Sequence, residues 1–313
     1  LRHTGYDEVA LSSLSTCDYS RVRELVRRTA EVAAVWGASV SLPSLRLDSF
    51  SLDLADMVQA VRKSGLTFAP EAATPKMRAV INKWISDDEL LSVTRQVYER
   101  GWDLVKLYFM IGLPGEKEED VEEIGKLLRR VLKGGGGREP LYGMHFTVSI
   151  STFVPKPHTP FQWVAQMSLP EVARRHFILR ETLRIKGVTF RWHDREMSYV
   201  EGLLARGDRR LFPVVTRAAE RGCLDNWTEQ FSFDRWQEAV RAEGLDMAWY
   251  VERERDRDEV LPWDHLDCGV SKDFLWSEYE RSLRGELTPD CRFDACSQCG
   301  VCSEEVRIRL ATR

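Results

Sequence analysis

Short apolar segments alternate with amphipathic helical patterns along the first two-thirds of the chain. The apolar segments are rich in branched and aromatic side chains, and we read most of them as apolar on both faces, which is typical of buried parallel strands. We therefore predict six strands, at Asp7–Ser15, Ala38–Arg46, Leu66–Ala73, Leu104–Gly112, Met144–Val154 and Val188–Asp194.

The helical patterns between these strands begin at recognisable caps. Ser86 is followed three residues later by Glu89, and Ser168 is followed in the same way by Glu171, so both sites predict capping boxes. The run 116–133 has acids in its first turns and bases in its last, which suits the helix dipole. Alternating strands and helices predict an α/β fold with a parallel sheet, either a barrel or a doubly wound sheet.

The pattern changes near Met197, where strands disappear and tryptophans and charge runs become common. We expect three regions: an α/β region over 1–195, a helical extension over 196–260 and a tail over 261–313. The opening "LRHTGYDEV" resembles the end of a helix just before a strand. We therefore expect the chain to be a fragment that lacks an N-terminal segment.

Charge and cysteine content limit the classes of function. The chain has 45 Lys and Arg against 49 Asp and Glu, a net charge of −4, which argues against a general polyanion binder. No apolar run reaches the roughly 18 residues that span a bilayer, and no signal peptide is recognisable, so we expect no membrane partner. Seven cysteines, four of them clustered, fit a reducing, cytoplasmic location better than a disulfide framework.

Candidate binding residues follow the strands, since ligands of parallel α/β folds bind at the carboxyl ends of strands. Glu71 follows the third strand, where its carboxylate could receive a ribose hydroxyl or an ammonium group, or could simply begin a helix. Gly112 lies in "MIGLPGE", a turn that lets a ligand approach the backbone or that merely connects strand to helix. Arg78 and Lys83 could meet a ligand carboxylate or be solvated.

The histidines give weaker signals. His158 lies in the proline-rich exit "TFVPKPHTPFQW", where it could be a general base, although a lone loop histidine is more often structural. The segments "RWHDRE" and "WDHLDCGV" each pair His with Asp without the spacing of a known metal site. We interpret both as core or interface features.

Four cysteines near the end of the chain form the strongest local motif. Cys291, Cys296, Cys299 and Cys302 have the spacing C-x4-C-x2-C-x2-C. Thiolates two residues apart can chelate one metal centre, and zinc and an iron–sulfur cluster both fit this pattern. The role of such a centre could be structural or electron transfer.

Three strand-end segments together resemble a known family. "TFAPEAATPKMRAVINK", "GWDLVKLYFMIGLPGEKEEDV" and "VSISTFVPKPHTPFQW" are similar to the later part of the radical S-adenosylmethionine core, in the branch of methylthiotransferase-like and cobalamin-binding proteins. The tail, with "LPWDHLDCGVSKDFL" and "TPDCRFDACSQCGVC", resembles an uncharacterised subfamily of that branch. The resemblance covers roughly 4–195 and 191–302. It implies a partial (β/α)6 barrel with strands two to six present, followed by a mainly helical region and a four-cysteine site.

The resemblance also implies a chemistry. Enzymes of this family cleave S-adenosylmethionine reductively at a [4Fe-4S] cluster, and the 5′-deoxyadenosyl radical then modifies a substrate. The chain lacks the C-x3-C-x2-C cluster motif, which we expect upstream of Leu1, and lacks the usual Gly-Gly-Glu after the second strand. The resemblance further implies an external electron donor, cobalamin bound by a missing N-terminal domain, and a tRNA or ribosomal component as substrate. It makes the cysteine quartet an auxiliary iron–sulfur site, with zinc as the alternative.

Motif position assigns residues to the methionine part of S-adenosylmethionine. The resemblance places Ser13, Ser15 and Thr16 beside the methionine amino group. Arg78 or Lys83 would face the methionyl carboxylate.

Motif position likewise assigns residues to the nucleoside part. Glu71 falls where the family has a residue near the ribose. Gly112 and Leu113, with Ser151 and Phe153 on the last barrel strand, fall near the adenine.

Two other hypotheses belong to different classes. The first is a zinc-stabilised α/β binding protein without radical chemistry. The second is a non-radical α/β barrel enzyme in which Glu71 and His158 act as acid and base, although no clear acid–base pair occupies matched strand ends.

Overall fold

Two parallel sheets organise the first two-thirds of the molecule. The computed structural model describes residues 1, 3–12, 19–41, 54, 57, 65–134, 139–222, 225, 227–291 and 294–302. One sheet pairs β1 (Glu8–Ala10) with β2 (Ser39–Ser41), and the other has the order β3-β4-β5-β6. The strands of the larger sheet are β3 (Leu66–Glu71), β4 (Leu104–Ile111), β5 (His145–Thr152) and β6 (Val188–Trp192).

Each predicted strand contains one strand of the structure, and every strand pair is parallel, so the predicted α/β class is confirmed. The described residues place β1–β2 and β3–β6 in separate sheets. The partial (β/α)6 barrel is therefore not confirmed, although an α/β fold with a parallel sheet is shown.

Helices connect the strands in the predicted places. They are α1 (Val22–Val35), α3 (Pro75–Val80), α4 (Asp87–Glu99), α5 (Glu118–Leu132) and α6 (Leu169–Thr182). The capping boxes at Ser86 and Ser168 are both formed, with Glu89 accepting the Ser86 N–H at 2.7 Å. Helix α6 ends at Thr182.

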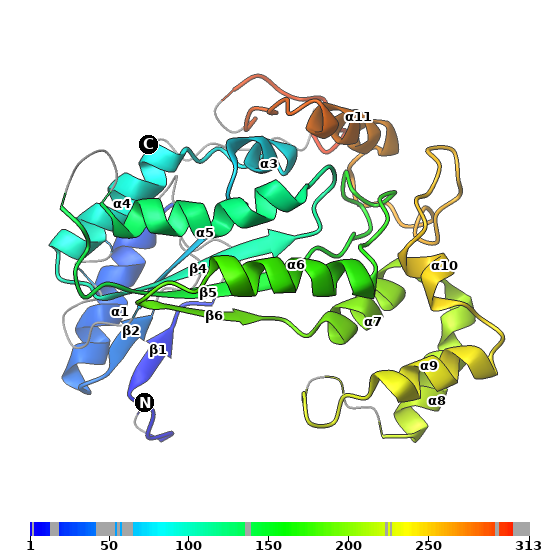
Figure 1. Cartoon of the computed structure of the whole chain (residues 1–313), viewed down its shortest axis with the longest axis horizontal. Helices are drawn as coiled ribbons and strands as arrows, with labels where there is room; N and C mark the ends of the chain where they lie inside the picture. The colour runs from blue at the N-terminus through cyan, green and yellow to red at the C-terminus, as the bar shows by residue number, and fades with distance from the viewer. Residues whose placement is uncertain are drawn as a thin grey trace.

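The two faces of the larger sheet carry different side chains. One face is apolar and packs in a single core with α4, α5 and α6, which lie across it in Figure 1. Its central residues are Val105, Leu107, Phe109 and Ile111 of β4 and Phe146, Val148 and Ile150 of β5.

The opposite face, here called the polar face, is half-buried or exposed. Its residues align across the strands in three rows, Lys106–Thr147–Thr189, Tyr108–Ser149–Arg191 and Met110–Ser151. Tyr108 is 44% exposed. The prediction that these strands are apolar on both faces is therefore wrong. Tyr108 and Met110 are aromatic or apolar in the sequence, but they alternate with the buried positions and lie on the polar face.

Helices form the rest of the described chain. They are α7 (Arg195–Arg206), the 3-10 helix η2 (Arg209–Leu211), α8 (Phe212–Glu220), α9 (Phe233–Ala242), α10 (Met247–Val251) and α11 (Lys272–Leu283). Helices α7 to α10 have an apolar cluster of their own. Within the described part of the chain, no helix is long and apolar enough to cross a membrane. The division into three regions stays a prediction.

The tail packs against the segment that leaves β5. Trp163 is fully buried with Leu261, Trp263 and Leu275, and the Trp263 indole donates to Gln162 Oε1 at 2.6 Å. Helix α11 lies beside α3 (Figure 1). The end of "TFVPKPHTPFQW" is therefore part of the core that the tail covers.

A buried arginine ties α7 to one earlier and one later segment. The guanidinium of Arg206 is 0% exposed and donates to the carbonyls of Val164, Tyr250 and Arg253. Burial and the charges of Arg255 and Arg253 lower the pKa of Arg206 to about 9, so it stays charged at neutral pH.

We predict that Arg206→Met destabilises the fold by about 3 kcal/mol, because it leaves three buried carbonyls without their donor. Urea denaturation followed by circular dichroism measures the change. Arg209→Met, on the exposed 3-10 helix that follows, is the matched control and should change stability by less than about 0.5 kcal/mol. Equal effects of the two substitutions would show that the buried contacts do not stabilise the fold.

Candidate functional site

Glu71 ends β3 in a backbone conformation that few residues other than glycine adopt. Its φ is +67°, and the pairing of β3 with β4 shifts register between Phe68 and Glu71. The left-handed region costs an ordinary side chain roughly 1–2 kcal/mol. Such strain concentrates at functional sites, so the conformation marks Glu71 as a candidate.

The carboxyl group of Glu71 is half-buried beside a positive charge. Burial raises the pKa of Glu71, while the charge of Lys83 acts in the opposite direction. The structure therefore brings together two of the predicted residues, Glu71 and Lys83. A carboxyl with a raised pKa at a strand end can accept hydrogen bonds or exchange a proton.

A second buried carboxyl closes the turn after β4. Glu116 Oε2 accepts the Gly112 N–H at 2.7 Å and the Arg175 Nε–H at 3.2 Å. Burial raises the pKa of Glu116 to about 7, although Gly112 and Arg175 both favour its carboxylate. Sequence reasoning missed Glu116, although it is the last residue of the "MIGLPGE" segment that was singled out.

Gly112 allows the turn to pass close to another segment. Its φ is +88°, and an added Cβ would lie 3.0 Å from Met167 Cε. A pocket of about 320 Å³ adjoins the turn and is lined in part by Gly112, Leu113, Gln166 and Met167. The glycine is therefore needed for the turn itself, whether or not a ligand approaches it.

Three other predicted residues lie near the same edge. Leu113 is buried in a small apolar cluster that Phe153 packs against. Phe153 also contacts Phe161 edge-on, with ring centroids 5.6 Å apart. Ser151 lies on the polar face, and its hydroxyl donates to the Phe109 carbonyl at 3.4 Å. Leu113 and Phe153 thus have packing roles, whereas Ser151 borders the accessible face.

Arg78 is occupied within the protein. Its guanidinium is 1% exposed, donates to the carbonyls of Ala72 and Ala73 at 3.2 and 3.1 Å, and pairs with Asp87. These contacts fasten α3 to the start of α4 and leave Arg78 in a structural role.

The remaining candidates are outside the described residues or apart from the edge. Ser13, Ser15 and Thr16 lie outside the described residues. His158 has a φ of +55° and donates its backbone N–H to Gln162 Oε1 at 3.1 Å. This contact belongs to the buried β5 exit and supplies no acid–base partnership with Glu71.

The four clustered thiols approach one another without forming a closed site. Burial, then the charges of Asp290 and the other three thiols, raises the pKa of Cys291. The Gln298 N–H donates to Cys296 Sγ at 3.4 Å. No group of three His, Cys, Asp or Glu side chains in the described ranges is arranged to hold a metal ion.

Comparisons with known proteins give few relatives. No family model matches the chain. An uncharacterized protein of Methanocaldococcus jannaschii is 30% identical over 205 residues, which cover 66% of this chain and 42% of that protein. The chain thus spans under half the length of this relative.

A solved structure, a sugar phosphate isomerase/epimerase from Parabacteroides distasonis, aligns over 91% of this chain and 94% of its own with 12% identity and a TM-score of 0.34. A TM-score this low does not establish a shared fold.

These findings contradict the radical S-adenosylmethionine identification. No family model matches, and the Methanocaldococcus jannaschii relative carries no such description. The physical reason lies in the motifs, because residues that carried the resemblance serve the fold: Glu116 closes a turn, Arg78 joins two helices and Trp163 is core. The radical reaction and the iron–sulfur sites implied by the resemblance are withdrawn with it.

The raised pKa of Glu116 predicts a pH dependence of stability. The unfolded chain loses this proton near its ordinary value of 4.5, and the folded chain near pH 7. The contribution of Glu116 to the free energy of unfolding is therefore fully present below pH 4.5 and is lost as the pH rises to about 7. Glu116→Gln, which cannot ionise, should gain about 1–3 kcal/mol of stability relative to the natural chain between pH 5 and pH 8.

Urea denaturation at pH 5 and at pH 8 tests this prediction. Glu119→Gln, at a nearby exposed position, is the control and should show no such gain. A difference between Glu116→Gln and the natural chain that is constant with pH would show that Arg175 keeps Glu116 ionised throughout.

Proposed function

We propose that the chain binds a small polar molecule at the carboxyl edge of the β3–β6 sheet, with Glu71 as the carboxylate that receives the molecule's hydroxyl or ammonium donors. The strained φ of +67° at Glu71 is the observation that supports the proposal most directly. A glycine there would remove the strain, so a side chain kept in this conformation points to a function for the carboxylate.

The polar face supports a polar ligand. Parallel sheets usually bury both faces, but this sheet presents Lys106, Tyr108, Ser149 and Arg191 on a half-buried or exposed surface. These groups supply donors, acceptors and two positive charges along the face that ends at the carboxyl edge, with Lys106 in the amino-terminal half of β4. A molecule with several hydroxyl groups, or with an ammonium and an acidic group, matches this chemistry.

The proposal extends to enzymatic activity by proton transfer. Because burial raises the pKa of Glu71, its carboxyl is better suited to taking up and returning a proton than an exposed glutamate. Lys83 lies close enough to stabilise the ionised form and so to tune this exchange. Binding of S-adenosylmethionine or cobalamin, a tRNA or ribosomal partner, an electron donor and a cytoplasmic location stay untested predictions.

We expect Glu71→Gln to weaken the binding of whichever probe the natural chain binds by about 10- to 100-fold, since the substitution removes a charge-assisted hydrogen bond. Isothermal titration with D-ribose, adenosine, lysine and S-adenosylmethionine separates hydroxyl from ammonium recognition. Glu99→Gln, at the exposed end of α4, is the charge-matched control and should bind as the natural chain does. Binding that Glu71→Gln leaves unchanged would place the ligand elsewhere and reject the proposal.

The strain provides a second readout for the same residue. Glu71→Gly should stabilise the fold by about 1 kcal/mol because glycine accepts a positive φ, whereas Glu71→Gln should not. Both variants should bind the ligand more weakly than the natural chain. Stabilisation together with loss of binding would show that the side chain is retained for function at a cost to stability.

A second candidate function is zinc binding by the tail, favoured by the contact at Cys296. The Gln298 N–H reaches Cys296 Sγ, and Gln298 and Gly300 have φ of +58° and +99°, so the chain turns sharply around the Cys296–Cys299 arm. Such a turn directs two thiols to the same side. Zinc would draw in Cys291 and Cys302, which coupled metal binding and folding permits.

We expect the purified protein to bind one equivalent of zinc, measured by mass spectrometry of its metal content and by competition with a chromophoric chelator. Cys296→Ser should abolish binding, because three thiolates hold zinc far less tightly than four. Cys268→Ser, outside the quartet, is the control and should retain it. Absence of zinc binding, or equal loss in both variants, would reject this second function.

A further inference from the structure

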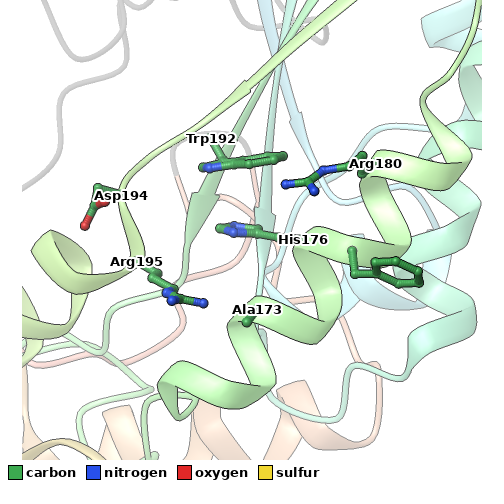
Figure 2. A pocket seen from close by; sticks show the side chains of 7 residues that line it. Ala173, His176, Arg180, Trp192, Asp194 and Arg195 are labelled. Atoms are coloured by element: carbon green, nitrogen blue, oxygen red, sulfur yellow. The ribbon is translucent and has the colours of Figure 1, made fainter.

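A pocket of about 360 Å³ lies between α6 and the turn from β6 into α7, on residues that the carboxyl-edge site does not use. Helix α6 contributes Ala173, His176, Phe177 and Arg180, and the turn contributes Trp192, Asp194 and Arg195. Figure 2 shows the His176 imidazole beneath the Trp192 ring, with Arg180 and Arg195 on different sides of it.

His176 is the buried polar group of this pocket. The residue is 7% exposed, and its ring stacks on Trp192 with centroids 4.6 Å apart and an interplanar angle of 14°. Its Nε2 atom is buried and has no hydrogen-bond partner among the described residues. A buried ring nitrogen without a partner is costly, and a ligand group in the pocket would satisfy it.

Positive charge surrounds the imidazole. Arg180 lies 5.4 Å from the Trp192 centroid, and no carboxylate of the described chain lies within ion-pair distance of it. Among the carboxylates that the structure describes, Glu196 alone lies within ion-pair distance of Arg195, at 4.0 Å. Burial lowers the pKa of His176 to about 4, and Arg195 and Arg180 act in the same direction, so the ring is neutral at physiological pH.

The carboxylate of the pocket is already engaged. Asp194 caps α7, and its Oδ1 accepts the N–H groups of Glu196 at 2.8 Å and Met197 at 2.9 Å. Asp194 therefore offsets the positive end of the α7 dipole, and its charge opposes the effect of the two arginines on the pKa of His176 only in part. The pocket therefore presents the guanidinium groups of Arg180 and Arg195 and the unpartnered Nε2 of His176 beside the Trp192 ring.

We propose that this pocket binds the oxyanion group, phosphate or carboxylate, of a small molecule. Arg180 and Arg195 supply the charge, and His176 donates a hydrogen bond from Nε2, which requires the neutral ring to carry its proton on that atom. Trp192 and the exposed ring of Phe177 border the position of the molecule's apolar part. This site lies at the carboxyl end of β6, shares no residue with the Glu71 site and does not depend on the function proposed there.

Nuclear magnetic resonance of the whole chain tests the proposal with inorganic phosphate and with acetate as probes, at constant ionic strength kept by sodium chloride. We expect saturable shifts of the His176 imidazole and Trp192 indole resonances. Tighter binding of phosphate would identify a phosphate-bearing ligand and tighter binding of acetate a carboxylate. Shifts that stay linear for both probes would overturn the proposal.

Substitutions locate the binding groups. Arg180→Gln and Arg195→Gln should each weaken the probe by about 10-fold or more, since each removes a charge-assisted hydrogen bond. Arg174→Gln is the matched control, because Arg174 is on the same helix but pairs with Glu118. This variant should bind the probe with unchanged affinity. An equal loss of affinity in this variant would show that only the net charge of the protein matters, and would overturn the proposal.

His176→Phe separates recognition from packing. Phenylalanine keeps an aromatic ring against Trp192 but removes the ring nitrogens. We expect the variant to melt at or above the temperature of the natural chain and to bind the probe at least several-fold more weakly, read from the Trp192 indole. Unchanged affinity would show that His176 is only a core residue.

Discussion

The common direction of β3 to β6 decides where binding can occur in this protein. Because the strands are parallel, their carboxyl ends lie at one edge, and the segments that leave them meet there. Helices α4 to α6 bury the apolar face, which supplies most of the core. The other face is thereby free to carry Lys106, Tyr108 and Ser149, which a doubly covered sheet could not accommodate without buried unpaired polar groups.

The strain at Glu71 is sustained by the packing just beyond it. The Ala72 N–H donates to the Pro70 carbonyl at 2.8 Å, and Ala72 is buried with Met77, Val80 and Leu113. Arg78 then holds the carbonyls of Ala72 and Ala73 from α3. Relaxing the backbone at Glu71 would break these contacts, so the surrounding structure fixes the conformation at a cost that the apolar cluster offsets.

The sequence was sufficient for the strands and for the start of the capped helices. Alternation of apolar segments and capped helices located all six strands, and the position of Glu71 after an apolar strand marked it as a candidate. Its positive φ could not be read, because a register shift is a property of the pairing with β4. Arg78 was misjudged for a similar reason: its partner Asp87 is nine residues away, and only the packing of α3 against α4 brings them together.

The resemblance to a radical enzyme family and the missed pocket have a common cause. Glycine–proline turns and proline-rich strand exits are common where a parallel strand leads into a helix. Such sequence motifs therefore indicate local backbone geometry more than chemical function. His176 carried no motif, and its stacking on Trp192 follows from the pairing of β6 with β5 and the packing of α6 against that edge.

Two hydrogen bonds join the tail to the segment that follows α3, close to the carboxyl edge. Asn82 and Thr288 exchange two hydrogen bonds, with the Asn82 amide donating at 3.1 Å and the Thr288 N–H donating at 2.9 Å. Lys83, next to Asn82, is the charge that acts on Glu71, and Cys291 follows Thr288 by three residues. If the two proposed sites bind their ligands, the Asn82–Thr288 pair is the contact through which a ligand at Lys83 and a metal at the cysteine segment would affect each other. Linkage requires that any such coupling be equal in both directions.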